Sequence, residues 1–178
     1  MNQRLLKRGD GKPLSVLSGS GVFQGYASLF HHRDPSGDIV MPGAFADSLK
    51  RRRPADIRML FQHDPAEPVG TWIDMTETPR GLFVRGRLDR NVQRGRELIS
   101  LLETGGLDGL SIGFRTTLAR HDRVNKARRL IAVDLLEISL VTFPMLDGAR
   151  VTRTKAALWA LAQSFFGKGP NTIQHGAN

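Results

Sequence analysis

Short stretches in which hydrophobic and polar residues alternate recur along the chain, and they predict a protein built mainly from β-strands. Residues 21–30 alternate in this way, and the Pro, Ser, Gly and Asp within residues 31–38 predict a long turn after them. Residues 57–63 place three apolar side chains and then His63 on one face, because strand side chains alternate with a period of two. His63 is therefore predicted to close an inward-facing apolar row.

Further strands are predicted in the second half of the chain. Residues 71–75 and 82–89 flank a segment that contains a Pro and a Gly, which suits a tight hairpin connection. Residues 110–117 and 130–143 follow the strand pattern too, and the second of these is apolar on both faces. The basic residues 119–129 between them predict an exposed loop.

Apolar residues at helical spacing predict three helices. A short surface helix is expected from Pro42 to about residue 52, and a longer amphipathic helix over residues 91–104 with Gly105 just beyond its end. A third helix is expected over residues 155–166.

The expected organisation is one domain with a tail at each end. Residues 1–20 are polar with little periodicity and predict a loose N-terminal arm. Residues 21–150 form the predicted domain, and residues 151–178 the C-terminal helix and tail.

The composition fits a soluble protein with one real core, since 40% of the 178 residues are hydrophobic. The lack of cysteine excludes disulfides, thiolate zinc sites and cysteine nucleophiles. No apolar run approaches the ~20 residues that span a bilayer, and residues 1–8 lack the apolar stretch of a signal peptide. A cytosolic protein is expected.

The formal net charge of +9 should attract acidic partners, which could be nucleic acid or acidic protein. Basic residues cluster at residues 50–53 and 120–129, but no aromatic side chain lies among them to stack on bases. The pattern favours solvated basic loops over a nucleic-acid site.

Three side chains on separate predicted strands could together carry out acyl transfer. Ser111 shares one strand face with Gly113, so that glycine leaves room beside the hydroxyl. His63 stands half-buried at a strand end, and Glu137 is a carboxylate in an apolar strand, where it needs a partner. A hydroxyl, an imidazole and a carboxylate supply the nucleophile, the proton carrier and the orienting anion of a catalytic triad.

Each of these side chains also has an ordinary structural explanation. Ser111 could be a plain strand-edge serine, and His63 a hydrogen-bonded residue at the edge of the core. Glu137 could form a salt bridge with one of the many arginines. The question that decides between these explanations is whether His63 reaches Glu137.

Two other motifs are set aside. Residues 109–113 match G-x-S-x-G, but that nucleophile elbow needs a strand, a sharp turn and then a helix, whereas here a helix precedes and a strand follows. His31, His32 and Asp34 could suggest a metal cluster, but adjacent residues project apart and no second spaced histidine pair accompanies them. Neither a metal nor another cofactor is expected.

Five segments, in their order and spacing, carry a resemblance to a known family. They are GYASLF at residues 25–30, DIVMPGAF at 38–45, QHDP at 62–65, GLSIGF at 109–114 and EISLVTFP at 137–144. From about Gly21 to Pro144 the chain resembles the prohead proteases of tailed bacteriophages, which are distantly related to the herpesvirus assemblins. After Pro144 it departs from the pattern, with Met145 to Gly148 in place of an Asn-Pro ending.

The resemblance implies a fold, an activity and roles for named residues. It implies a closed antiparallel β-barrel with peripheral helices, and it assigns the family's histidine to His63, its serine to Ser111 and its third member to Glu137. The implied enzyme is a serine endopeptidase whose substrates are the scaffold, or a scaffold-like segment of the capsid protein, and its own tail. It would act inside the assembling procapsid, in the cytoplasm of the host bacterium.

Two rival functions are weighed against this one. A non-catalytic basic component of capsid assembly, or a nucleic-acid-binding component, could keep the same fold with merely structural Ser111, His63 and Glu137. An unrelated hydrolase such as an esterase could use the same three groups.

Overall fold

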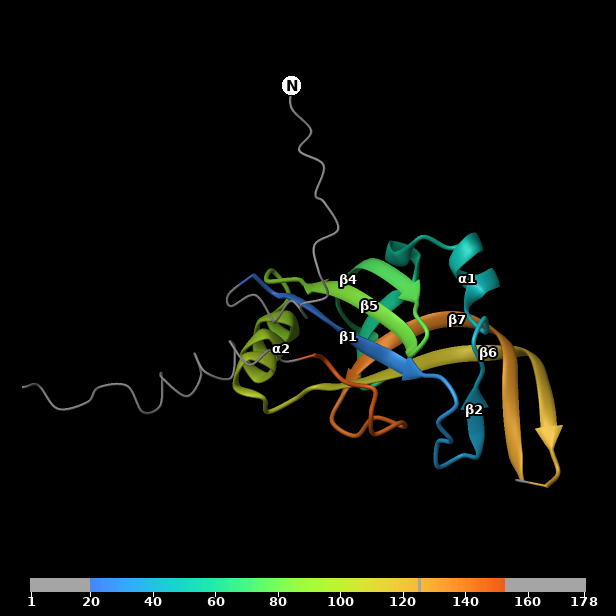
Figure 1. The fold of residues 1–178 in the computed structure, drawn as a ribbon. Coiled ribbons are helices and arrows are strands. Elements are labelled where there is room, and N and C mark those ends of the chain that lie inside the picture. The colour runs from blue at the N-terminus through green and yellow to red at the C-terminus, as the bar shows by residue number, and fades with distance from the viewer. Residues whose placement is uncertain (1–19, 125, 153–178) are drawn as a thin grey trace, which may run out of the picture.

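The fold is mainly β and consists of a curled sheet with helices packed against it (Figure 1). The computed structural model describes residues 20–124 and 126–152. The elements of these residues are, in chain order, β1 Val22–Leu29, β2 Asp38–Val40, α1 Ala46–Arg51, the 3-10 helix η1 Pro54–Asp56, β3 Arg58–Phe61, β4 Asp64–Glu77, β5 Gly81–Leu88, α2 Gln93–Thr104, β6 Gly109–Asp122 and β7 Ala127–Val141.

Strand β7 organises the sheet, whose neighbours run in the order β1-β5-β4-β3-β7-β2 with β6 on the other edge of β7. The short strands β2 and β3 lie end to end along one edge of β7, and both run parallel to it. The gap between them is filled by α1 and the residues just before it, since Leu135 N donates to Ser48 Oγ of α1 and Val133 N donates to Ala44 O. These two bonds continue the hydrogen bonding of this edge of β7 between β2 and β3.

The structure differs from the predicted closed antiparallel barrel in the direction of two strands and in its closure. The two pairings of β7 with β2 and β3 are parallel, so the prediction of an all-antiparallel sheet was wrong. Alternation shows which face a side chain takes but not the direction of the neighbouring strand. The strands curl into a half-barrel in which β1 and β6 are not paired with each other.

A short segment after β7 joins the two open edges at one end of the sheet. Arg150 forms an isolated bridge with Gly109 at the start of β6, and Val151 forms one with Gly25 of β1. Val151 is 5% exposed and belongs to the hydrophobic core. The segment with Arg150 and Val151 thus bridges β6 and β1, which do not pair with each other directly.

The core fills the inside of the curled sheet. Phe23 of β1 and Trp72 of β4 are each 1% exposed and meet edge to face, with ring centroids 5.5 Å apart. Helix α2 adds Leu98 and Leu102, which are buried, and ends at Gly105, whose φ of 80° is the left-handed conformation that glycine adopts readily. The two helices predicted before residue 105 are confirmed, and the helix predicted at residues 155–166 lies outside the described residues.

The predicted loop at residues 119–129 was wrong, because β6 and β7 continue through most of it as a paired ribbon, with β2 along the other edge of β7 from Arg128. This ribbon extends away from α2 (Figure 1). Most β6 side chains from Arg115 to His121 are exposed, so the hydrophobic pattern did not mark a strand there. No helix of the described residues is long and apolar enough to cross a membrane.

Candidate active site

His63 lies in the tight turn between β3 and β4, and not at the end of an inward row as predicted. Phe61 pairs with Asp64, and the two residues between them, Gln62 and His63, have φ values of 54° and 61°. Left-handed conformation at both central residues is typical of a type I′ hairpin turn. The strand alternation therefore ends before His63, whose side chain is 42% exposed.

The end of β7 holds this turn in place. His63 N donates to Ser139 Oγ over 3.1 Å, and Gln62 N donates to Leu140 O over 3.0 Å. The Gln62 side chain also donates from Nε2 to Thr142 Oγ1 over 2.6 Å. A left-handed residue other than glycine costs roughly 1–2 kcal/mol, and these contacts offset that strain.

His63 reaches Glu137. His63 Nδ1 and Glu137 Oε1 are 2.6 Å apart, and Ser139 Oγ donates to the other carboxylate oxygen over 2.7 Å. These two contacts satisfy both oxygens of Glu137 within the protein, as its side chain needs because it is only 14% exposed. The described partners of Glu137 are thus His63 and Ser139, not an arginine.

This contact changes the acid-base chemistry of the imidazole. The hydrogen bond that Glu137 accepts from the His63 ring raises the pKa of His63 above its ordinary value of 6.5. Partial burial lowers this pKa, and the charge of the carboxylate raises it further. With Nδ1 on the carboxylate, Nε2 is the nitrogen left to exchange a proton with another group. An oriented imidazole of this kind can act as a general base.

Ser111 lies on the neighbouring strand β6, directly opposite Ser139 in the ladder, and is 6% exposed. Direct cross-strand neighbours have Cβ atoms about 4.5–5.5 Å apart. Because Ser139 Oγ accepts the backbone N–H of His63, Ser111 stands across from the residue that anchors the histidine. Ser111, Ser139 and Glu137 therefore lie on one face of β6 and β7, and His63 contacts that face through Ser139 and Glu137.

Gly113 explains how the carboxylate fits. It pairs with Glu137, and a Cβ added at Gly113 would lie 2.0 Å from Glu137 Oε1. The sequence predicted that this glycine leaves room beside the hydroxyl, and its closest approach is to the carboxylate. The register also shifts between Gly113 and Phe114, which marks a β-bulge beside the site.

Ser139 is the site residue that sequence reasoning did not single out. It is 0% exposed and contacts both His63 and Glu137. Its position two residues after Glu137 in a strand was the available signal, since residues i and i+2 share a face. A buried hydroxyl on the face of a candidate carboxylate is a candidate partner for it.

The histidine pair at the start of the β1–β2 connection has a different environment. His32 Nδ1 is 2.7 Å from Phe30 O, and His31 has a left-handed backbone with a φ of 62°. Within residues 20–124 and 126–152, no group of three or more His, Cys, Asp or Glu side chains could hold a metal ion.

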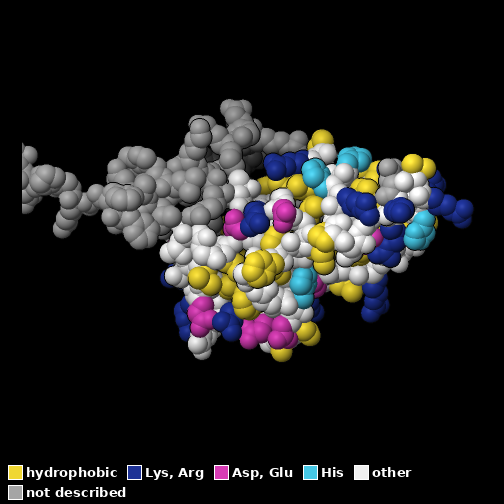
Figure 2. Space-filling model, turned by 90° about the horizontal axis from the view of Figure 1, so that it is seen from below, with side chains coloured by type: hydrophobic (Ala, Val, Ile, Leu, Met, Phe, Trp, Pro, Cys, Tyr) yellow, Lys and Arg dark blue, Asp and Glu magenta, His cyan; other side chains and the backbone are white. Residues whose placement is uncertain are grey.

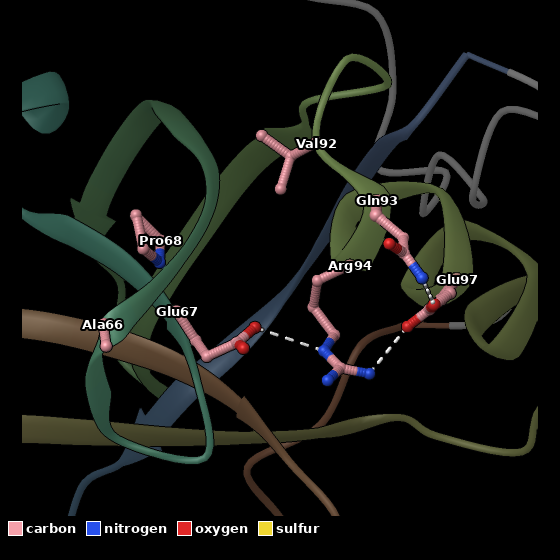
Figure 3. Close-up of a pocket in the computed structure, with 7 residues that line it drawn as sticks. All are labelled: Ala66, Glu67, Pro68, Val92, Gln93, Arg94 and Glu97. Atoms are coloured by element: carbon pink, nitrogen blue, oxygen red, sulfur yellow. Dashed lines mark hydrogen bonds and ion pairs between the residues drawn. The ribbon is translucent and has the colours of Figure 1, made fainter.

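The hollow drawn in Figure 3 lies away from these groups. It has a volume of about 460 Å³ between the start of β4 and the start of α2. Arg94 occupies it, paired with Glu67 over 3.2 Å and with Glu97 over 2.6 Å. The charges of Arg94, Glu67 and Glu97 compensate one another, and no serine or threonine lines this hollow. It is therefore not the candidate active site. Arg94 also lies over the Phe61 ring, 5.1 Å from its centroid, and so braces the hairpin that carries His63.

Comparison with solved structures identifies the class of fold. The chain is similar to the bacteriophage T4 capsid assembly protease, with a TM-score of 0.57, 12% identity, and coverage of 67% of this chain and 80% of that one. It is also similar to the KSHV protease crystallised with a hexapeptide phosphonate inhibitor, with a TM-score of 0.50, 12% identity, and coverage of 83% and 77%. At this identity the likeness concerns the fold, which is that of these viral proteases.

Residues 13–163 match the family model described as caudovirus prohead serine protease, and the chain belongs to this family. The prohead protease of Enterobacteria phage HK97 is 34% identical over 150 residues, which are 83% of this chain and 63% of the relative. The prohead protease of Escherichia phage T5 is 29% identical over 137 residues, 75% of this chain and 63% of the relative. The chain thus spans somewhat less than two thirds of the length of these relatives.

Proposed function

We propose that this chain is a serine endopeptidase of capsid maturation, with Ser111 as nucleophile, His63 as general base and acid, and Glu137 as the group that orients His63. The observation that carries the proposal is the 2.6 Å contact of His63 Nδ1 with Glu137, on the strand face that also bears Ser111. Family membership supports the same activity and does not favour a non-catalytic role.

In the proposed reaction His63 Nε2 takes the hydroxyl proton as Ser111 Oγ bonds to the carbonyl carbon of a peptide. The resulting imidazolium, stabilised by Glu137, gives that proton to the amide nitrogen as the C–N bond breaks. Water then attacks the acyl-enzyme, with His63 again taking and returning the proton. The products are a carboxylate and an amine, and Ser111 is regenerated.

The open edge of β6 supports an extended peptide as the substrate. Across the described residues, the ladder of β6 from Ser111 to Asp122 has β7 as its one strand neighbour. A sheet edge offers unpaired N–H and C=O groups to an added strand. A cavity of about 60 Å³ beside Ser111, lined by Leu29, Leu110 and Leu146 among others, could take an apolar side chain.

The proposed substrates are scaffold or scaffold-like capsid-protein segments and the enzyme's own tail. The named relatives are prohead proteases, which supports a site of action inside the assembling procapsid in the cytoplasm of the host bacterium. No metal or other cofactor takes part in the proposed chemistry.

A fluorophosphonate probe tests the nucleophile. Intact-mass analysis of the purified protein should show one adduct, and the Ser111→Ala variant should show none. Ser100→Ala is the matched control, because Ser100 is exposed on α2, and this variant should label like the original chain. Equal labelling of Ser111→Ala and Ser100→Ala would refute Ser111 as the nucleophile.

Co-expression with a capsid-protein precursor then separates a peptidase from an esterase. A peptidase should shorten the precursor when Ser111 is present and leave it intact in Ser111→Ala. Hydrolysis of a small ester without any shortening would favour the esterase.

A further inference from the structure

Arg115 is a charged residue that the proposed reaction does not use, although it shares a strand face with the nucleophile. Ser111, Gly113 and Arg115 alternate along β6 with no bulge in that strand between them, so all three project to the same side. The rise of about 3.3 Å per residue places Arg115 roughly 13 Å from Ser111 along the open edge.

Asp134, the acidic residue opposite Arg115, forms ion pairs with other arginines. Arg115 pairs in the ladder with Asp134, but Asp134 forms ion pairs with Arg51 over 3.4 Å and with Arg52 over 3.1 Å. Arg52 donates to the carbonyl of Leu135 as well, which holds it on that side of β7. The Asp134 carboxylate thus already pairs with two guanidinium groups, neither of them that of Arg115.

Arg115 is left with an exposed, uncompensated charge. Within the described residues, no acidic side chain pairs with it. Its environment is basic further along the ribbon too, where Arg120, Arg123 and Lys126 are exposed. Figure 2 shows Lys and Arg side chains gathered at the end of the molecule where the ribbon projects.

We propose that Arg115 is a specificity-determining residue that binds a carboxylate side chain of the substrate about four residues from the scissile bond. A peptide added to the edge of β6 runs alongside Ser111 and Arg115 in step, because paired strands have nearly the same rise per residue. The residue opposite Arg115 then has its side chain within reach of the guanidinium. This inference rests on the proposed function, because it assigns a preference to the same cleavage reaction.

The occupant is an acidic segment of another polypeptide. Residues 153–178 contain no Asp or Glu, so a cut within that segment would not use the contact with Arg115. The net charge of +9 also favours an acidic partner over a basic one.

A peptide library tests the preference. The full chain is incubated with peptides derived from a digested proteome, and the new ends are read by mass spectrometry. Asp and Glu should be enriched at one position about four residues from the cleaved bond. The Arg115→Ala variant should lose this enrichment while the residues next to the cleaved bond stay the same.

A matched pair of peptides gives the size of the effect. A cleaved peptide with Glu at that position should have kcat/KM about two- to fivefold higher than its Gln counterpart, as expected for one partly exposed charge contact. Arg115→Ala should bring the ratio to about one, and Arg115→Glu should favour Lys instead. Arg87→Ala, at an exposed arginine of β5, is the control and should keep the original ratio.

The outcomes separate this inference from the proposed function. If no library peptide is cleaved in a Ser111-dependent way, the proposed function fails, and this inference with it. If cleavage occurs but acids are not enriched, or the enrichment survives in Arg115→Ala, the role of Arg115 is refuted and the proposed function stands.

Discussion

At the scale of single residues, Glu137 holds the His63 ring through Nδ1 and raises the pKa of that imidazole. Its two oxygens are shared between His63 Nδ1 and Ser139 Oγ, and it fits only because Gly113 has no side chain. A carboxylate this poorly exposed would be unfavourable without such partners. Four residues from two strands and one turn thus depend on one another for their geometry.

The Glu137→Gln variant tests this dependence through pH. Because Glu137 raises the pKa of His63, the acid limb of the pH-rate profile should lie above the ordinary histidine pKa of 6.5. In Glu137→Gln the limb should move to lower pH, and the maximal rate should fall roughly 10²- to 10⁴-fold. An NMR titration of the His63 ring should show the same downward movement of its pKa. An unmoved limb would contradict the role of Glu137.

The same pair links stability to pH. A raised pKa in the folded state means that protonated His63 stabilises the fold fully below its unfolded pKa, and that this contribution is lost as pH rises through the folded pKa. The stability difference between the original chain and Glu137→Gln should therefore be larger at about pH 5.5 than at about pH 9.

At the scale of elements, the β3–β4 turn positions His63 through a strained, left-handed backbone. Gln62 and His63 are both left-handed, and contacts with the end of β7 and with Arg94 keep the hairpin in place. Glycine would adopt these backbone angles more readily, but it would lack the side-chain contacts.

Substitution of Gln62 separates strain from contacts. Gln62→Ala loses the bond to Thr142 and keeps the strain, so it should reduce the free energy of unfolding by about 1–2 kcal/mol. Gln62→Gly loses the same bond but relieves the strain, so it should be more stable than Gln62→Ala by up to about 1 kcal/mol.

Thr76, exposed in the extended strand β4, is the control position for this comparison. There alanine should be more stable than glycine, since the backbone is not left-handed. Urea unfolding of all four variants measures both differences. The same order of alanine and glycine at both positions would contradict the strain argument.

At the scale of the whole molecule, the segment around Val151 joins the two open edges of the sheet. It lies between the start of β6 and β1 at one end, which leaves the rest of the β6 edge open beside Ser111. The fold thus combines a joined end, which supports the core, with an open edge, which the proposed substrate needs.

Val151→Ala tests the contribution of this segment to stability. Removing two buried methyl groups and leaving a cavity should reduce the free energy of unfolding by about 2 kcal/mol. Val124→Ala is the control, because Val124 at the ribbon end is 91% exposed and should unfold like the original chain. Equal stability of the two variants would show that Val151 does not support the core.

The sequence by itself determined the elements whose hydrophobic pattern is strong and the identity of the candidate residues. Strand β1, the β4–β5 hairpin and helix α2 followed from alternation, turn residues and a terminal glycine, which are local signals. Family motifs pointed to Ser111, His63 and Glu137, and Glu137 was conspicuous as a carboxylate among apolar neighbours.

Only the tertiary structure decided how these residues meet. The pattern of one strand does not identify the strand that pairs with it, so the parallel pairing of β3 with β7, which brings Ser139 beside the His63 turn, was not predicted. The β6–β7 ribbon beyond residue 118 also escaped prediction, because most β6 side chains there are exposed and their pattern marks no strand. Long-range backbone pairing supplies both features, and through them the contact between His63 and Glu137 and the open edge that begins at Ser111.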